Sequence, residues 1–115
     1  MRIAWHKIKG HPNYEINRLG QIRSAKTGQI LKPFDDNRGY LRVTMEGKNY
    51  KVHILVANQF IPKPVSSLPL VVNHIGGDKH DNRASQLEWV TQSENIKHAW
   101  EHGLIRRQKN ENKVN

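Results

Sequence analysis

The sequence predicts an α+β fold in which a small antiparallel β-sheet precedes a strand–loop–strand–helix unit. Three observations lead to this expectation. The first half consists of short alternating runs separated by turns rich in Gly, Asn and Asp, which are typical of antiparallel strands. Residues 53–60 contain no strong turn former and group their apolar side chains as a short buried helix does. Residues 91–94 (Thr-Gln-Ser-Glu) match a capping box, which marks the start of another helix.

The first half is expected to form short strands that each end in a turn. The expected strands are residues 5–8, 14–16, 21–24, 29–32, 40–45 and 50–52. Between them lie turn segments at 17–20, 26–28, 35–39 and 46–49. Each of these segments contains a glycine, which accepts backbone angles that other residues avoid.

The second half changes character after residue 52. The interpretation of residues 53–60 as a helix leaves a strand as the alternative, because Ile54 and Val56 are β-branched. His53 would cap or pack the start of this helix. The prolines at 62, 64 and 69 then predict a non-helical linker that follows the surface.

After the linker, residues 70–72 and 87–90 are expected to be strands, joined by a glycine turn and a polar loop over 78–86. The capping box should start a helix that runs to about His102, with Gly103 as its C-terminal stop. Trp89, Ile96 and Trp100 are expected to face the core because they fall on apolar faces. Residues 105–115 are expected to form a flexible polar tail.

Composition limits the classes of function. The net charge is +9, and residues 1–60 carry 11 Lys or Arg against 4 Asp or Glu. Binding to a polyanion such as nucleic acid explains a basic first half better than solubility alone does. The absence of Cys excludes disulfides and thiol chemistry. No apolar run approaches the ~20 residues of a membrane helix, and no signal peptide is evident, so an intracellular protein is expected.

The stretch 71–95 holds the residues best suited to chemistry. His74 follows an apolar strand end and precedes a glycine turn, whereas Asn95 lies in the first turns of the helix. At about 100° per residue, Asn95, His98 and His102 share one stripe of that helix. If the hairpin packs on the helix start, Asn73, His74 and Asn95 converge. The alternative is a polar hairpin and helix in which these side chains have structural roles only.

Such a cluster suits phosphodiester cleavage. The reaction needs a general base to activate water and a cation to stabilise charge on the phosphate and the leaving oxygen. A histidine that titrates near neutral pH suits the first task. Asparagine carbonyl oxygens are hard ligands suited to Mg²⁺, which keeps several waters and takes substrate oxygens as further ligands.

The chain resembles phage-type HNH homing endonucleases of the ββα-metal fold, preceded by an N-terminal nuclease-associated modular DNA-binding motif. The resemblance covers about residues 4–104. Its nuclease part comprises the segments 53–57, 60–62, 72–79, 87–91 and 94–95, together with Asn82. Its N-terminal part comprises Trp5, Gly20, and the segments 14–17, 22–24, 31–33 and 39–40.

The resemblance implies a role for each matching residue. His74 would be the general base, and Asn73 and Asn95 would bind one divalent metal ion, most simply Mg²⁺ or Mn²⁺. Gln86 falls at the middle HNH position, which ties the loop together. The accessory candidates are Asp78 as an outer carboxylate, Asn82, which suits a turn better than a ligand, and His98, which would touch phosphate or solvent.

The partner that the resemblance implies is double-stranded DNA. The expected phosphate contacts are Arg18, Arg23, Lys26, Lys32, Arg38 and Arg42, acting as a group. The corresponding organisation is a basic DNA-binding module over 1–52, an HNH nuclease unit over 53–104 and the tail over 105–115. One active centre per chain predicts single-strand nicking by a monomer or weak dimer, acting in the cytoplasm of a bacterial or phage-infected host.

Two alternatives remain open from the sequence. Asn73 and Gln86 motivate the first, a DNA-binding or inhibitory protein that keeps the HNH fold with weak or no catalysis. The second is an RNA-binding protein, which depends on charge alone.

Overall fold

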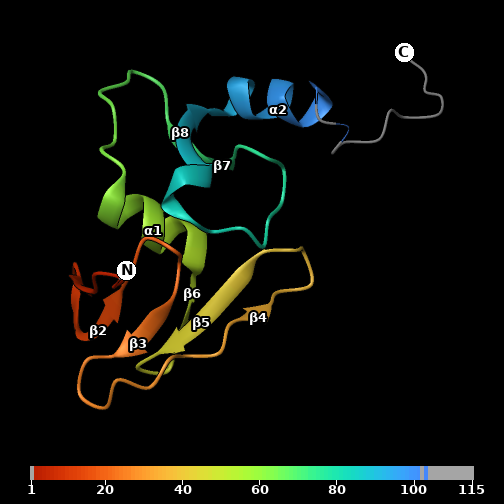
Figure 1. The fold of residues 1–115 in the computed structure, drawn as a ribbon. Coiled ribbons are helices and arrows are strands. Elements are labelled where there is room, and N and C mark those ends of the chain that lie inside the picture. The colour runs from red at the N-terminus through yellow and green to blue at the C-terminus, as the bar shows by residue number, and fades with distance from the viewer. Residues whose placement is uncertain (1, 102, 104–115) are drawn as a thin grey trace.

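The computed structural model describes residues 2–101 and 103, and it combines antiparallel strands with two helices (Figure 1). In the first half the elements are β1 (His6–Ile8), β2 (His11–Ile16), β3 (Ile22–Ser24), β4 (Phe34–Asp35), β5 (Leu41–Met45) and β6 (Lys48–Lys51). In the second half they are α1 (Val52–Phe60), β7 (Leu70–His74), the 3-10 turn η1 (Ala84–Gln86), β8 (Leu87–Thr91) and α2 (Gln92–Glu101). The predicted α+β fold is confirmed.

The strands form three small antiparallel sheets. Their orders are β1-β2-β3, β4-β5-β6 and β7-β8. The β5–β6 hairpin closes through Glu46 and Gly47, whose φ angles are 52° and 80°. Two consecutive left-handed residues match the right-handed twist of the flanking strands, which is why this short turn fixes the register.

A single hydrophobic cluster joins the two halves of the chain. α1 runs between the sheets in Figure 1 and buries Val52, Leu55, Val56 and Ala57. The cluster also takes residues from the first two sheets and from the β7–β8 hairpin, namely Ile8, Ile16, Ile22, Val43, Met45, Val72 and Leu87. The position of the hairpin therefore depends on the packing of the first half.

Residues 53–60 form a helix, so the alternative of a strand is wrong. Several details of the first half also differ from expectation. β2 begins at His11 rather than at residue 14, and Val52, expected to end a strand, is the first residue of α1. Residues 29–32 form only one bridge, between Ile30 and Arg23, because Pro33 follows at once and has no N–H for a ladder. β4 was not predicted. Lys48 and Asn49 belong to β6, because the turn before them needs only two residues.

The final helix confirms its predicted capping box and its glycine stop, but not its predicted face. The Thr91 N–H donates to Oε1 of Glu94 at 2.8 Å and the Glu94 N–H donates to Oγ1 of Thr91 at 3.2 Å, which is a capping box. Gly103 has φ 67° and its N–H donates to the Trp100 carbonyl at 3.2 Å, as a helix stop does. His102 and residues 105–115 lie outside the described residues.

The prediction that Ile96 and Trp100 face the core is wrong, because these side chains are 45% and 46% exposed. The helix is turned so that Asn95, His98 and Ala99 face the hairpin instead. Trp89 does pack against the core, and its Nε1–H donates to the Ile61 carbonyl at 3.0 Å. Within the described part of the chain, neither helix has the length and apolar character needed to cross a membrane.

Candidate active site

The β7–β8 hairpin places the candidate residues at the end of a strand. Asn73 is paired with Glu88, and His74 with Leu87. Because successive residues of a strand point to opposite faces, His74 shares a face with Val72 and Leu87, while Asn73 shares a face with Glu88. α2 follows β8 directly and contacts both strands. The polar end of β7 is thereby brought next to the first turns of α2.

A cavity of about 170 Å³ lies between the hairpin, α2 and the first half of the chain. Its lining includes Tyr40, Asn73, His74, Lys79, Asn95 and His98. The structure thus brings together Asn73, His74 and Asn95, as the sequence predicted, with His98 beside them. No carboxylate is among the described residues that line this cavity.

His74 is held in a defined orientation inside the protein. Its side chain is only 6% exposed, and its Nε2 lies 2.8 Å from Oδ1 of Asn82. An amide oxygen only accepts hydrogen bonds, so Nε2 carries the proton and Nδ1 keeps its lone pair. Burial lowers the pKa of His74, and the bond to Asn82 and the carboxylates of Asp78 and Asp81 partly oppose that shift. A neutral imidazole with a free Nδ1 has the form that a general base requires.

Asn82 is therefore more than a turn former, although it is not part of the cavity lining. Its side chain is 5% exposed and orients the ring of His74. The sequence singled out Asn82 among the accessory candidates, but the partner of its amide was not foreseen.

Two further rings support His74, and sequence reasoning did not assign them to the site. His53 packs at 4.9 Å from His74, measured between ring centroids, and Tyr40 stacks on His53 at 4.9 Å. The pKa of His53 is lowered to about 4, first by burial and second by the electrostatic effect of His74. His53 is therefore neutral near pH 7. His53 is the second residue of α1, and Tyr40 directly precedes β5, so these two elements support the ring of His74.

The loop between β7 and β8 is held by turns of the first half of the chain. The Ala84 N–H donates to the Arg18 carbonyl at 2.8 Å. Nζ of Lys79 donates to the Arg38 carbonyl at 3.1 Å and lies 4.7 Å above the ring of Tyr40. Nε2 of His80, an exposed residue, lies 2.8 Å from Oδ2 of Asp35. The basic first half therefore braces the loop that carries Asn82.

Gln86 ties this loop through its main chain. Its carbonyl accepts the Ile75 N–H at 2.8 Å, and its own N–H donates to the Arg83 carbonyl at 2.8 Å. Asp78 shapes the same loop, since its Oδ1 accepts the His80 N–H at 2.9 Å. His98 approaches from α2, where its Nε2 lies 2.6 Å from the Ile75 carbonyl oxygen. These contacts close the end of the hairpin around the cavity.

The donor set suits a hard divalent cation with few protein ligands. No group of three or more His, Asp or Glu side chains within residues 2–101 and 103 is arranged to hold a metal ion. The side chain of Asn73 is 6% exposed and its Nδ2–H donates to Oε2 of Glu88 at 2.7 Å, which leaves Oδ1 as its free acceptor. Together with Asn95, this oxygen fits Mg²⁺, which keeps waters and takes substrate oxygens.

The six predicted phosphate contacts have different surroundings. Arg23 pairs with Glu15 at 2.8 Å and Arg42 pairs with Asp36 at 3.0 Å, so both already have acidic partners. The guanidinium of Arg18 lies 4.8 Å above the ring of Phe60. The exposed members of the group are Arg18, Lys26, Lys32 and Arg38. Of the six, these four are therefore the side chains open to a polyanion in solution.

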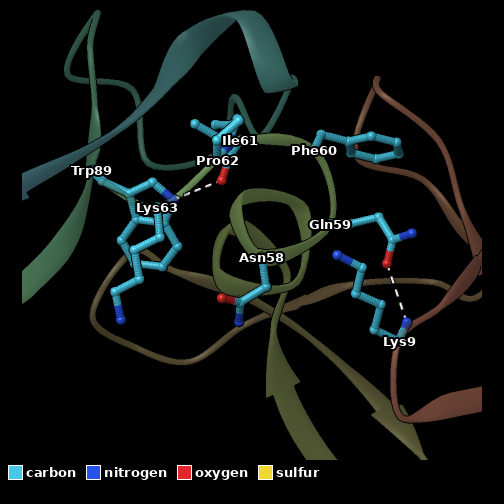
Figure 2. A pocket seen from close by; sticks show the side chains of 8 residues that line it. All are labelled: Lys9, Asn58, Gln59, Phe60, Ile61, Pro62, Lys63 and Trp89. Carbon is cyan, nitrogen blue, oxygen red and sulfur yellow. Dashed lines mark hydrogen bonds between the residues drawn. The ribbon is translucent and has the colours of Figure 1, made fainter. Parts of the chain in front are cut away.

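A second hollow, of about 440 Å³, lies at the C-terminal end of α1 (Figure 2). Gln59 crosses to the first sheet there, where its side chain accepts the Lys9 N–H and donates to the Lys7 carbonyl, both at 3.1 Å. Lys63 covers the ring of Trp89 with Nζ 4.9 Å from its centroid. This hollow has no lining residue in common with the candidate active site.

Comparison with known families identifies both parts of the chain. Residues 4–46 match the NUMOD4 motif and residues 50–97 match the HNH endonuclease domain. The chain therefore combines a NUMOD4 motif with an HNH endonuclease domain, which confirms the resemblance inferred from the sequence.

Similar proteins come from phages and a giant virus. The chain is homologous to the DNA endonuclease I-HmuI of Bacillus phage SP01, with 34% identity over 108 residues that cover 90% of this chain and 61% of that protein. An uncharacterized HNH endonuclease of Acanthamoeba polyphaga mimivirus is 41% identical over 104 residues, covering 85% of this chain and 26% of that protein.

A solved structure supports the same relation. A structure on DNA binding and cleavage by the homing endonuclease I-HmuI matches with a TM-score of 0.78 and 33% identity, covering 92% of this chain and 63% of that one. The chain thus spans about a quarter to three-fifths of the length of these relatives.

Proposed function

We propose that this protein is a divalent-metal-dependent DNA endonuclease that hydrolyses phosphodiester bonds with His74 as general base. The observation that carries the proposal is the bond from His74 Nε2 to Asn82, made at the edge of a cavity that Asn73 and Asn95 also line. It leaves Nδ1 of a neutral imidazole to take the proton of an attacking water. The homology to a phage DNA endonuclease supports the same reaction.

Each residue of the site then has one task. His74 takes a proton at Nδ1, while Asn82, His53 and Tyr40 hold its ring in place. Asn73 and Asn95 would hold one Mg²⁺ or Mn²⁺ ion, which supplies charge stabilisation on the phosphate and the leaving oxygen when bound. Gln86 and His98 keep the hairpin end closed through the main chain around Ile75.

The substrate is double-stranded DNA, gripped by the exposed cations of the first half of the chain. A single centre of this kind per chain predicts single-strand nicking by a monomer or weak dimer. The phage and viral origin of the relatives supports action inside a host cell.

Plasmid nicking with Mg²⁺ or Mn²⁺ tests the proposal. His74→Ala is expected to lower the nicking rate at least about 100-fold, because general-base catalysis contributes roughly 10²–10⁴. His6→Ala is the matched control, since His6 is exposed in β1 and lies outside the cavity lining. Nicking by His74→Ala at the wild-type rate would contradict the assignment.

A DNA-binding protein with weak or no catalysis is the second candidate. It is favoured by one observation, the absence of a carboxylate among the described residues that line the cavity. Tight binding to duplex DNA without cleavage in any divalent metal would select it over the nuclease.

A further inference from the structure

A carboxylate lies directly behind the candidate metal ligand Asn73. We propose that Glu88 is a positioning residue for the metal site, which orients the amide of Asn73 and supplies the negative charge that two asparagine ligands lack. This inference rests on the proposed function, and it gives Glu88 a task beyond its place in the hairpin.

The contact between the two side chains is built into the hairpin. Asn73 and Glu88 are register partners in the β7–β8 pair, so their Cβ atoms project side by side from one face. Nδ2 of Asn73 donates to Oε2 of Glu88 at 2.7 Å, a short distance that fits a bond to a charged acceptor. Asn73 is buried and Glu88 is half-buried, so the pair lies inside the hairpin region rather than at a mobile edge.

The bond decides which end of the amide is offered to a cation. An asparagine side chain has a donor end and an acceptor end of nearly equal size, and only the oxygen binds a metal ion. Glu88 accepts but does not donate when ionised, so it selects the amide nitrogen and leaves Oδ1 for the ligand side. Without Glu88, the amide loses the contact that fixes this orientation.

The charge of Glu88 also balances the site. Asn73 and Asn95 are neutral, and the cavity lining contains the cation of Lys79. A divalent ion bound there needs a nearby anion, and Glu88 is joined to a ligand by one hydrogen bond. Carboxylates that act through a ligand in this way typically change metal affinity by about 10–100-fold when they are removed.

Mn²⁺ binding tests the role without relying on catalysis. The complex of protein and DNA duplex is titrated with Mn²⁺, and free Mn²⁺ is followed by EPR. The parent protein carries His74→Ala to limit cleavage, and every other substitution is added to it. Glu88→Ala is expected to weaken Mn²⁺ binding at least about tenfold. Glu88→Gln should weaken it less, because it keeps an acceptor oxygen and loses only the charge. Glu101→Gln, an exposed acid on α2, is the matched control and should bind as the parent does.

Moving the charge across the pair separates a metal-directed role from a structural one. Asn73→Asp alone faces Glu88 with a second carboxylate, so it is expected to lower the thermal midpoint in the absence of metal. Asn73→Asp combined with Glu88→Gln keeps the hydrogen bond in reverse and should bind Mn²⁺ at least as tightly as the parent. A purely structural pair would change the thermal midpoint and leave Mn²⁺ affinity unchanged.

The outcomes distinguish this inference from the proposed function. If Glu88→Ala and Glu88→Gln both bind Mn²⁺ as the parent does, the role of Glu88 is wrong while the nuclease proposal stands. Glu88→Gln decides the matter if the alanine variant fails to fold. If the parent complex retains no more Mn²⁺ than the duplex alone, the metal-dependent nuclease proposal itself fails.

Discussion

Replacing Gly20 with alanine tests whether the first half of the chain positions His74, the proposed general base. Gly20 has φ +85°, and a Cβ added to it would lie 2.8 Å from the carbonyl oxygen of Asn82 and 3.2 Å from its Cβ. Asn82 in turn holds His74 through a 2.8 Å bond. The added methyl group therefore pushes on the main chain of Asn82, whose side chain bonds directly to His74.

The expected cost has two parts. The left-handed conformation costs an alanine about 1 kcal/mol relative to glycine. The clash with the main chain of Asn82 adds about 1–3 kcal/mol, which is typical of overpacking. Gly28→Ala carries only the first part, because Gly28 has φ +75° and a methyl group added there would meet no other atom within 4 Å. The two variants thus share the strain and differ in the clash.

Urea unfolding and plasmid nicking measure the two effects separately. Gly28→Ala should lose about 1 kcal/mol of unfolding free energy and keep its nicking rate. Gly20→Ala should lose about 2–4 kcal/mol and nick up to about 100-fold more slowly, since a misplacement near 1 Å has a cost of that order. Equal nicking rates for the two folded variants would refute the link from Gly20 through Asn82 to His74.

Three further predictions follow from buried or capping groups. The pKa of His53 is lowered by burial to about 4 from its ordinary 6.5, so the unfolded chain binds more protons between these values. The stability due to neutral His53 is complete above about pH 6.5 and declines as the pH falls toward 4. Urea unfolding midpoints measured at several pH values should show this decline. The variant His53→Gln should make the midpoint less dependent on pH. Thr91→Ala removes the acceptor of the Glu94 N–H and should cost about 1 kcal/mol by thermal unfolding, whereas Ser93→Ala should cost little. Asn17→Ala, at a fully buried side chain that accepts the N–H groups of residues 19 and 21, should cost about 2–3 kcal/mol in urea unfolding; an unchanged midpoint would contradict the importance of that turn.

Local signals were enough to predict the convergence of the candidate site. The apolar run before Asn73 identifies the strand, and the capping box at Thr91 and Glu94 locates the start of α2. A helix that directly follows the second strand of a hairpin starts close to that hairpin, and α2 contacts both β7 and β8. Asn73, His74 and Asn95 therefore line one cavity, as expected from their positions in the sequence.

The orientation of α2 could not be predicted from periodicity. Ile96 and Trp100 form one stripe at a spacing of four residues, while Asn95 and His98 form another at a spacing of three. A hydrophobic pattern favours burying the first stripe, but the structure turns the second toward the hairpin. The bond from His98 to the Ile75 carbonyl and the lining role of Asn95 depend on that choice.

Contacts between distant segments were likewise beyond local reasoning. The partner of His74 is eight residues away, and the turn that supports this partner lies about sixty residues earlier in the chain. No periodicity or turn signal links Gly20 with Asn82, since their meeting depends on how α1 packs between the two halves.

These long-range contacts change the meaning of the basic first half of the chain. Charge alone suggests a module that binds DNA and is structurally independent of the nuclease unit. The contacts at Arg18, Asp35 and Arg38 instead attach its turns to the loop that carries Asn82. A DNA phosphate bound near Arg18 or Arg38 would therefore act on segments that also hold the loop with Asn82. We expect DNA binding to stiffen that loop. Hydrogen exchange at the amides of residues 79–84 should then be slower in the complex than in the free protein. Unchanged exchange there would show that DNA binding and support of the loop are independent.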